Sequence, residues 1–239
     1  MMLKRHGAEA LGTFTIVFAP VALSASGSLR GGDGGLLAAA LVSGLAVLAM
    51  IYTFGPISAA HFNPAVTLGF AVAKRFPWKF VLPYWLAQFF GAVVAAGAVA
   101  LLFGPGHGAH IPGDPSFIAR NIGTEAILSS ILMLVIIAVA TDKRISGSVP
   151  AIAIGFTVVF DVLIGGPVTG GSMNPARSFG PALFAGGQAL SVYWLYVVGP
   201  CLGAVVGAVL FETVRLEKEH AQGAPNELLE VLNEVSSER

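Results

Sequence analysis

Two asparagines, Asn63 and Asn174, occupy matching places in the two halves of the chain, and each is followed by Pro-Ala. Asn is a favoured helix N-cap, and Pro is tolerated at the first helical position because its missing N–H would be unpaired there anyway. Each motif therefore predicts the start of a short helix. The side-chain NH₂ groups of both asparagines could then donate hydrogen bonds to a passing molecule.

The segments before the two motifs also correspond, since 58–67 aligns without gaps to 169–178. Duplicated sequence in an apolar chain suggests an internal structural repeat. We expect both segments to be extended, with backbone carbonyls that act as hydrogen-bond acceptors along a pore. These carbonyls belong to Ala59, Ala60, His61, Phe62, Gly170, Gly171, Ser172 and Met173.

Two glutamates repeat in the same way, Glu9 in the first half and Glu125 in the second. A carboxylate inside an apolar span is costly and usually has a partner or a function. A proton relay is one interpretation. We favour a supporting role, in which each carboxylate accepts hydrogen bonds from backbone N–H groups of the loop before the motif. Asp161 is a third acid of this kind, without a counterpart in the first half.

The composition places these groups in a membrane, because 55% of the residues are hydrophobic and only 11% are charged. Two apolar pieces, 64–73 and 175–185, follow the motifs and are too short to span a bilayer. The predicted fold is an all-α membrane protein of six transmembrane helices and two re-entrant half-helices in an inverted repeat. The predicted spans are 7–27, 35–55, 80–103, 118–141, 148–166 and 190–214.

The repeat predicts three parts of the chain. Residues 1–110 form the first repeat, 111–215 form the inverted second repeat, and 216–239 form a polar tail. Lys and Arg collect on one side of the six-span arrangement, and the positive-inside rule then places both termini in the cytoplasm. We expect a multi-pass protein of the plasma (cell inner) membrane.

Several function classes are disfavoured by the composition. The net charge is zero, which gives no indication of a nucleic-acid partner. The single Cys201 argues against a zinc site. His107 and His110 have a spacing that could suit a metal, but no carboxylate or thiol clearly supports them. No catalytic set of Ser, His and Asp and no nucleotide-binding loop is apparent, so we predict no metal, no cofactor and no enzyme.

The two motif segments resemble the signature loops of the aquaporin (major intrinsic protein) family, and the likeness covers about 5–214. The resemblance implies a homotetramer in which each protomer has its own pore. It also implies that Asn63 and Asn174 meet at the membrane midplane and face the lumen, with Arg177 as the cationic member of an outer constriction.

Family spacing places the other members of this constriction at Ser43, Val162 and Gly171. Strict water channels typically have Phe and His at the first two positions. The set found here is similar to that of nodulin-26-like channels and their bacterial relatives. The resemblance therefore implies passage of water and small uncharged solutes, including metalloid hydroxides such as arsenous, boric or silicic acid, with exclusion of protons and ions.

Two alternatives remain open at this point. One is a water-selective aquaporin. The other is an ion-coupled secondary transporter, a class that also shows inverted repeats and broken helices. Saturable, gradient-coupled uptake would indicate a transporter, whereas linear bidirectional flux would indicate a channel.

Overall fold

The structure is a computed structural model that describes residues 2–29, 35–141 and 149–215. The predicted tail at 216–239 lies outside the described residues, as do the basic residues Arg30, Lys143 and Arg144 on which part of the orientation argument depends.

Within the described residues, six helices are long and apolar enough to cross a membrane, which makes the chain a multi-pass membrane protein. The same residues also form four shorter helices: α3 (Pro64–Val72), the 3₁₀ turn η1 (Trp78–Phe80), α7 (Pro175–Ala185) and α8 (Gly187–Ser191). The long helices are α1 (Met2–Leu29), α2 (Gly35–Ser58), α4 (Val81–Phe103), α5 (Ile118–Thr141), α6 (Val149–Thr169) and α9 (Leu195–Val214).

The observed bounds agree with the predicted ones to within one residue for α3, α4, α5 and α7 and differ by more elsewhere. Helix α1 begins at Met2 rather than residue 7, because a helix can continue into polar sequence beyond an apolar stretch. Helix α6 continues through Pro167 to Thr169, three residues past the predicted end. The predicted span 190–214 is two helices, since the chain turns between α8 and the start of α9 at Leu195.

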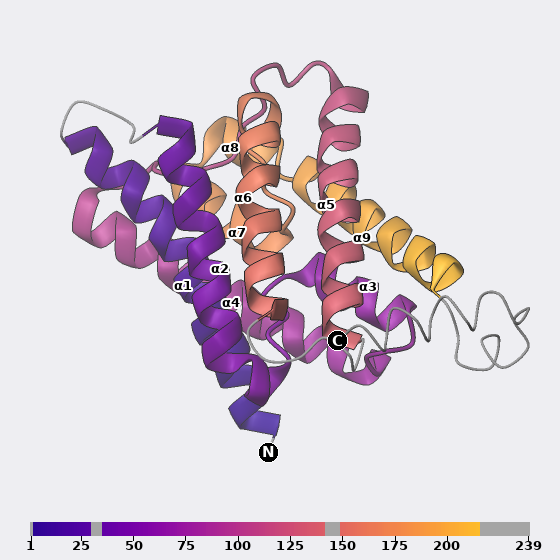
Figure 1. Cartoon of the computed structure of the whole chain (residues 1–239). Coiled ribbons are helices and arrows are strands. Elements are labelled where there is room, and N and C mark those ends of the chain that lie inside the picture. The colour runs from indigo at the N-terminus through magenta and orange to yellow at the C-terminus, as the bar shows by residue number, and fades with distance from the viewer. Residues whose placement is uncertain (1, 30–34, 142–148, 216–239) are drawn as a thin grey trace, which may run out of the picture.

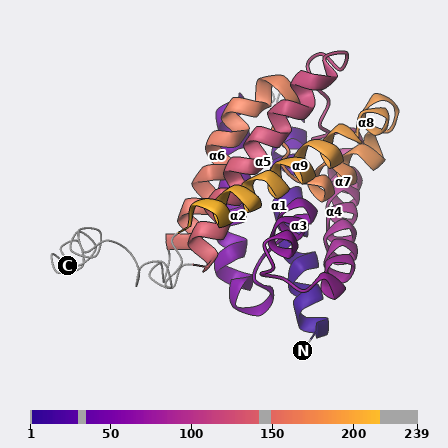
Figure 2. The same ribbon diagram turned by 90° about the vertical axis from the view of Figure 1, so that its right-hand side faces the viewer.

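The two halves use the same helix pairings. Helix α1 packs on α2 and α4, and α5 packs in the corresponding way on α6 and α9. Each half-helix packs on a long helix of the other half, α3 on α9 and α7 on α4, and α2 meets α6 between the halves (Figures 1 and 2). Glycines allow two of these contacts, because a Cβ at Gly91 would strike the carbonyl of Ala10 and a Cβ at Gly203 would strike that of Ala126.

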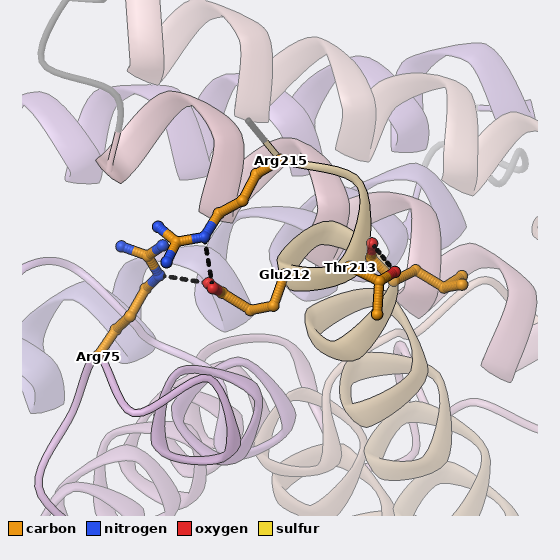
Figure 3. Close-up of polar contacts among 5 residues, drawn as sticks. Arg75, Glu212, Thr213 and Arg215 are labelled. Atoms are coloured by element: carbon orange, nitrogen blue, oxygen red, sulfur yellow. Dashed lines mark hydrogen bonds and ion pairs between the residues drawn. The ribbon is translucent and has the colours of Figure 1, made fainter. Parts of the chain in front are cut away.

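The six long helices alternate in direction, so the start of α1 and the end of α9 lie at the same end of the bundle. Figure 1 shows the start of α1 at one end and the loop 104–117 at the other. An ionic cluster joins α9 to the turn after α3 at the first of these ends (Figure 3). Glu212 accepts from Arg75 Nε and from Arg215 Nε, each at 2.7 Å.

Candidate functional site

Both half-helices begin as their sequence predicts. The backbone of Asn63 is extended (φ −152°, ψ 121°), its side-chain oxygen accepts from the N–H of Ala65 at 2.9 Å, and Pro64 takes the first helical position. Asn174 has the same conformation (φ −150°, ψ 109°) and accepts from the N–H groups of Ala176 and Arg177. Each asparagine thus satisfies N–H groups that a helix start would otherwise leave unpaired.

The two asparagine amides are also linked across the halves. Asn63 Nδ2 donates to the carbonyl of Met173 at 2.7 Å, and Asn174 Nδ2 donates to the carbonyl of Phe62 at 3.0 Å. These two carbonyls, which we expected to act as acceptors along a pore, therefore each already accept one hydrogen bond. Because an amide NH₂ carries two N–H groups and a carbonyl has two lone pairs, each partner keeps one site for another hydrogen bond.

The loops before the half-helices are turned rather than simply extended. Ala59, Ala60, Phe62 and Met173 all have φ between 50° and 69°, a region that residues other than glycine rarely adopt. Gly170 and Gly171 also have positive φ, which glycine adopts without strain. Backbone strain of about 1–3 kcal/mol per residue persists only where surrounding contacts hold it.

Glu9 supplies such contacts in the first half. Its Oε1 accepts from Ser58 Oγ at 2.7 Å and from the N–H of His61 at 2.9 Å. Its Oε2 accepts from the N–H of Phe62 at 2.7 Å and from Gln88 Nε2 at 2.8 Å. The fully buried carboxylate is therefore bonded through both oxygens to the loop and to α4.

Glu125 makes corresponding contacts in the second half. Its Oε1 accepts from Thr169 Oγ1 at 2.7 Å and from the N–H of Ser172 at 3.0 Å, and its Oε2 accepts from the N–H of Met173 at 2.7 Å. Within spans this apolar, hydrogen bonds to a charged acceptor are strong, and they fix the backbone that carries Asn174.

Aromatic side chains also donate hydrogen bonds to backbone carbonyls next to the two half-helices, contacts that the sequence analysis did not predict. Tyr84 Oη donates to the carbonyl of Ser58 at 2.9 Å, and Tyr196 Oη donates to that of Thr169 at 2.6 Å. Trp85 Nε1 likewise donates to the carbonyl of Pro64 at 3.0 Å. The two Tyr residues bond matching loop positions in the two halves, a relation that only the folded chain makes visible.

Two cavities meet at Arg177. The inner cavity, about 120 Å³, is lined by both asparagines and by the loop residues 59–62, 172 and 173. The outer cavity, about 510 Å³, reaches from Arg177 to the outer ends of α1, α2 and α6. Val162 and Arg177 line both, so they form the partition between them.

Three of the four residues predicted to form a constriction line the inner cavity, and Gly171 does not. Arg177 Nη2 donates to Ser43 Oγ at 3.4 Å, and both residues line the inner cavity with Val162. Gly171 lies behind Val162, where an added Cβ would come within 3.1 Å of the Val162 Cα. Gly170, its neighbour, lines the outer cavity.

Sequence reasoning missed a further partner of Arg177. His110, from the loop 104–117, contacts Arg177 Nη1 through its Nε2 atom and lines the outer cavity. Only its spacing from His107, which could suit a metal pair, drew attention to this histidine in the sequence. No local pattern predicts that a loop residue folds back onto a half-helix of the other repeat.

Two other polar residues are placed by the structure. His61 lines the inner cavity, with Nδ1 3.1 Å from Thr67 Oγ1 and its ring stacked on Phe70 at 4.8 Å. Asp161 on α6 is fully buried, and neither of its carboxyl oxygens has a hydrogen-bond partner among the described residues.

The fold and site define a membrane protein in which two half-helices, one from each half of the chain, line an inner cavity that adjoins an outer one at Val162 and Arg177. The family model of the major intrinsic proteins matches residues 1–211. The chain is 45% identical over 210 residues to Aquaporin NIP1-1 of Oryza sativa subsp. japonica, covering 87% of this chain and 73% of the relative. It is 41% identical over 216 residues to the Probable aquaporin NIP-type of Nicotiana alata, covering 90% and 79%.

A solved structure of an aquaglyceroporin is similar to this fold. The X-ray structure of the aquaglyceroporin from Plasmodium falciparum superposes with a TM-score of 0.81 at 27% identity, covering 90% of this chain and 97% of that one. The chain belongs to the major intrinsic protein family. It is therefore an aquaporin-type membrane channel and not an enzyme.

Proposed function

We propose that the protein is a passive channel for water and small uncharged solutes, including metalloid hydroxides such as arsenous, boric or silicic acid. We infer the solute class from the side chains that separate the inner and outer cavities at Arg177. Ser43 and Val162, which meet it there, have small side chains without rings. A neutral molecule with hydroxyl groups on all sides can accept from Arg177 and donate to backbone carbonyls, so its hydration is replaced during passage.

The same geometry supports exclusion of ions. The half-helices α3 and α7 direct their N-termini at one another, and each carries roughly half a positive elementary charge. A cation about 4 Å from Arg177 meets roughly 4 kcal/mol of repulsion at an effective dielectric constant of about 20. That repulsion alone reduces occupancy by about a thousandfold, while a neutral solute does not experience it.

Further parts of the proposal concern assembly and orientation. We place the protein in the plasma (cell inner) membrane with both termini in the cytoplasm, in line with Lys4, Arg5 and Arg75 lying at the end where α1 begins. We divide the chain into an inverted repeat of 1–110 and 111–215, supported by the matching helix pairings. The likeness to the family supports a homotetramer with one pore in each protomer.

Stopped-flow light scattering of proteoliposomes tests the proposal. Water, glycerol, urea, boric acid and arsenous acid are compared with empty vesicles of the same lipid. Water and the two metalloid hydroxides should pass faster than in empty vesicles, with flux linear in the gradient. Good water flux without metalloid flux would reject the proposed solute class, and saturable flux coupled to an ion gradient would indicate a transporter.

A water-selective aquaporin is the second candidate, and one observation favours it. The ring of His110 reaches the partition from the outer loop, so the entrance is narrower than Ser43 and Val162 alone would leave it. The same measurements separate the two candidates, because a water-selective channel would exclude glycerol, urea and both metalloid hydroxides.

A further inference from the structure

Two arginines meet one glutamate at the end of the bundle where α1 begins (Figure 3). Arg75 Nε and Arg215 Nε each donate to one oxygen of Glu212 at 2.7 Å, so these three side chains together carry one positive charge. All three are partly exposed, Arg75 by 21%, Arg215 by 36% and Glu212 by 25% of the side chain. The cluster lines neither the inner nor the outer cavity, so the passage described above does not use it.

Arg75 has further donors to offer. Its ion pair with Glu212 uses Nε, and within the described part of the chain neither of its NH₂ groups has a partner. The backbone holds the residue in place, since its N–H donates to the carbonyl of Phe70 in α3 at 2.8 Å. Because a guanidinium presents N–H groups in a planar fork, it can bind two oxygens of one phosphate at once.

An apolar face of α9 leads to this cluster. Leu202, Val206 and Val209 are 51%, 42% and 48% exposed, and Glu212 follows Val209 after one further step of three residues. Residues three or four positions apart are neighbours on a helix surface, so Leu202, Val206 and Val209 form an apolar stripe that ends at Glu212. A helix rises about 15 Å from Leu202 to Glu212, which is about half of the roughly 30 Å hydrocarbon core of a bilayer. The stripe therefore has the length of an acyl chain in one leaflet.

The neighbouring turn η1 indicates that the cluster lies at the level of the headgroups. Trp78 is 60% exposed at the start of η1, three residues after Arg75, and Lys79 beside it is exposed as well. Trp is enriched where the membrane meets water, and basic side chains near helix ends extend toward the headgroups. The arginines thus meet lipid phosphate at this depth, while the apolar stripe meets hydrocarbon.

We propose that the cluster and the apolar stripe form a binding site for a phospholipid with a net negative headgroup. The headgroup phosphate accepts from Arg75 and Arg215, and an acyl chain lies along the apolar stripe. Charge complementarity selects this occupant, because the cluster has one positive charge in excess and basic sites between helix ends attract anionic headgroups. The inference does not depend on which solute passes the channel. Since Arg75 is bonded to α3 and Glu212 belongs to α9, the bound lipid stabilises the folded protein across this contact.

Thermal unfolding of the full-length protein in detergent with added lipid measures this binding. Dioleoyl phosphatidylglycerol has a net negative headgroup, and dioleoyl phosphatidylcholine is the control with the same acyl chains and no net charge. Arg75→Gln and Arg215→Gln each remove one charge of the cluster, so either can be used if the other does not fold. Arg120→Gln is the matched control, because this exposed arginine lies beside Phe117 at the opposite end of the bundle.

Phosphatidylglycerol should raise the unfolding temperature of the wild type more than phosphatidylcholine does. Arg75→Gln and Arg215→Gln should need about fivefold more phosphatidylglycerol to reach half of the full shift, as expected for the loss of one charge near an anionic headgroup. Arg120→Gln should respond as the wild type does.

Equal shifts with the two lipids would overturn the inference, and so would a wild-type response in folded Arg75→Gln. Inorganic phosphate alone should leave the unfolding temperature unchanged. A shift as large as that with phosphatidylglycerol would also overturn the inference, because a free anion makes no use of the apolar stripe. These measurements involve no flux, so their failure is separate from a failure of the proposed function.

Discussion

Replacing Glu9 by Gln exchanges one acceptor oxygen for an NH₂ donor and changes little else in size. The wild-type carboxylate accepts four hydrogen bonds, from Ser58, Gln88 and the N–H groups of His61 and Phe62. The amide can accept on one oxygen only. Ser58 can rotate its hydroxyl, and Gln88 can present its Oε1, which has no partner within the described part of the chain, but a backbone N–H cannot turn around.

The expected loss of stability follows from the number of hydrogen bonds that the amide can no longer accept. Whichever way the new amide is oriented, the N–H of either His61 or Phe62 faces a donor in a buried place. An unsatisfied buried donor destabilises by about 1–3 kcal/mol, so Glu9→Gln should lower the free energy of unfolding by about that amount. Conduction should fall as well, because the same N–H groups hold the backbone before Asn63.

Thermal unfolding of purified protein in detergent, followed by tryptophan fluorescence, measures the loss of stability. Glu212→Gln is the control, since this carboxylate, with 25% of its side chain exposed, pairs with Arg75 and Arg215 at the end of α9 (Figure 3). Ion pairs near the protein surface contribute only about 0–1 kcal/mol. If Glu9→Gln unfolds at the wild-type temperature, or no earlier than Glu212→Gln, then Glu9 does not support the loop as argued.

The remaining predictions concern the passage and one buried acid. The double variant Asn63→Ala, Asn174→Ala loses both helix N-caps, each of which contributes about 1 kcal/mol, so the protein should be less stable and conduct less. Wild-type flux in the folded double variant would show that neither residue belongs to the pathway. The double variant Ser43→Phe, Val162→His should reduce boric acid flux more than water flux in stopped-flow measurements, and an equal reduction would contradict their place in the constriction. Asp161→Asn should be at least as stable as the wild type in thermal unfolding, because a carboxyl group with no hydrogen-bond partner among the described residues is costly to bury in its ionised form. A large loss of stability would show that the carboxyl group has an essential partner.

The spans and half-helices could be predicted because each depends on local sequence. Length and hydropathy define the long helices, and the Asn-Pro pair defines where α3 and α7 begin. The break between α8 and α9 was missed, because the sequence stays apolar across the turn at 192–194. Hydropathy does not register a change of chain direction within an apolar stretch.

Contacts between distant segments were predictable only where the repeat supplied a second copy. Glu9 and Glu125 could be paired with their loops because each occurs at a similar place in its half. His110 has no such copy, and its contact with Arg177 depends on how the outer loop folds back. The bonds between each asparagine and the opposite loop were also missed, since they exist only when the two half-helices meet.

Proton flux through the wild-type channel, recorded beside water flux in the same vesicles, tests the central claim most directly. A pH-sensitive dye inside the vesicles reports protons under an imposed potential, and Arg177→Val provides a comparison in which the fixed charge is absent. The account predicts water permeability well above that of empty vesicles, proton flux equal to theirs, and a higher proton flux in Arg177→Val. A wild-type proton current well above the empty vesicles would contradict it.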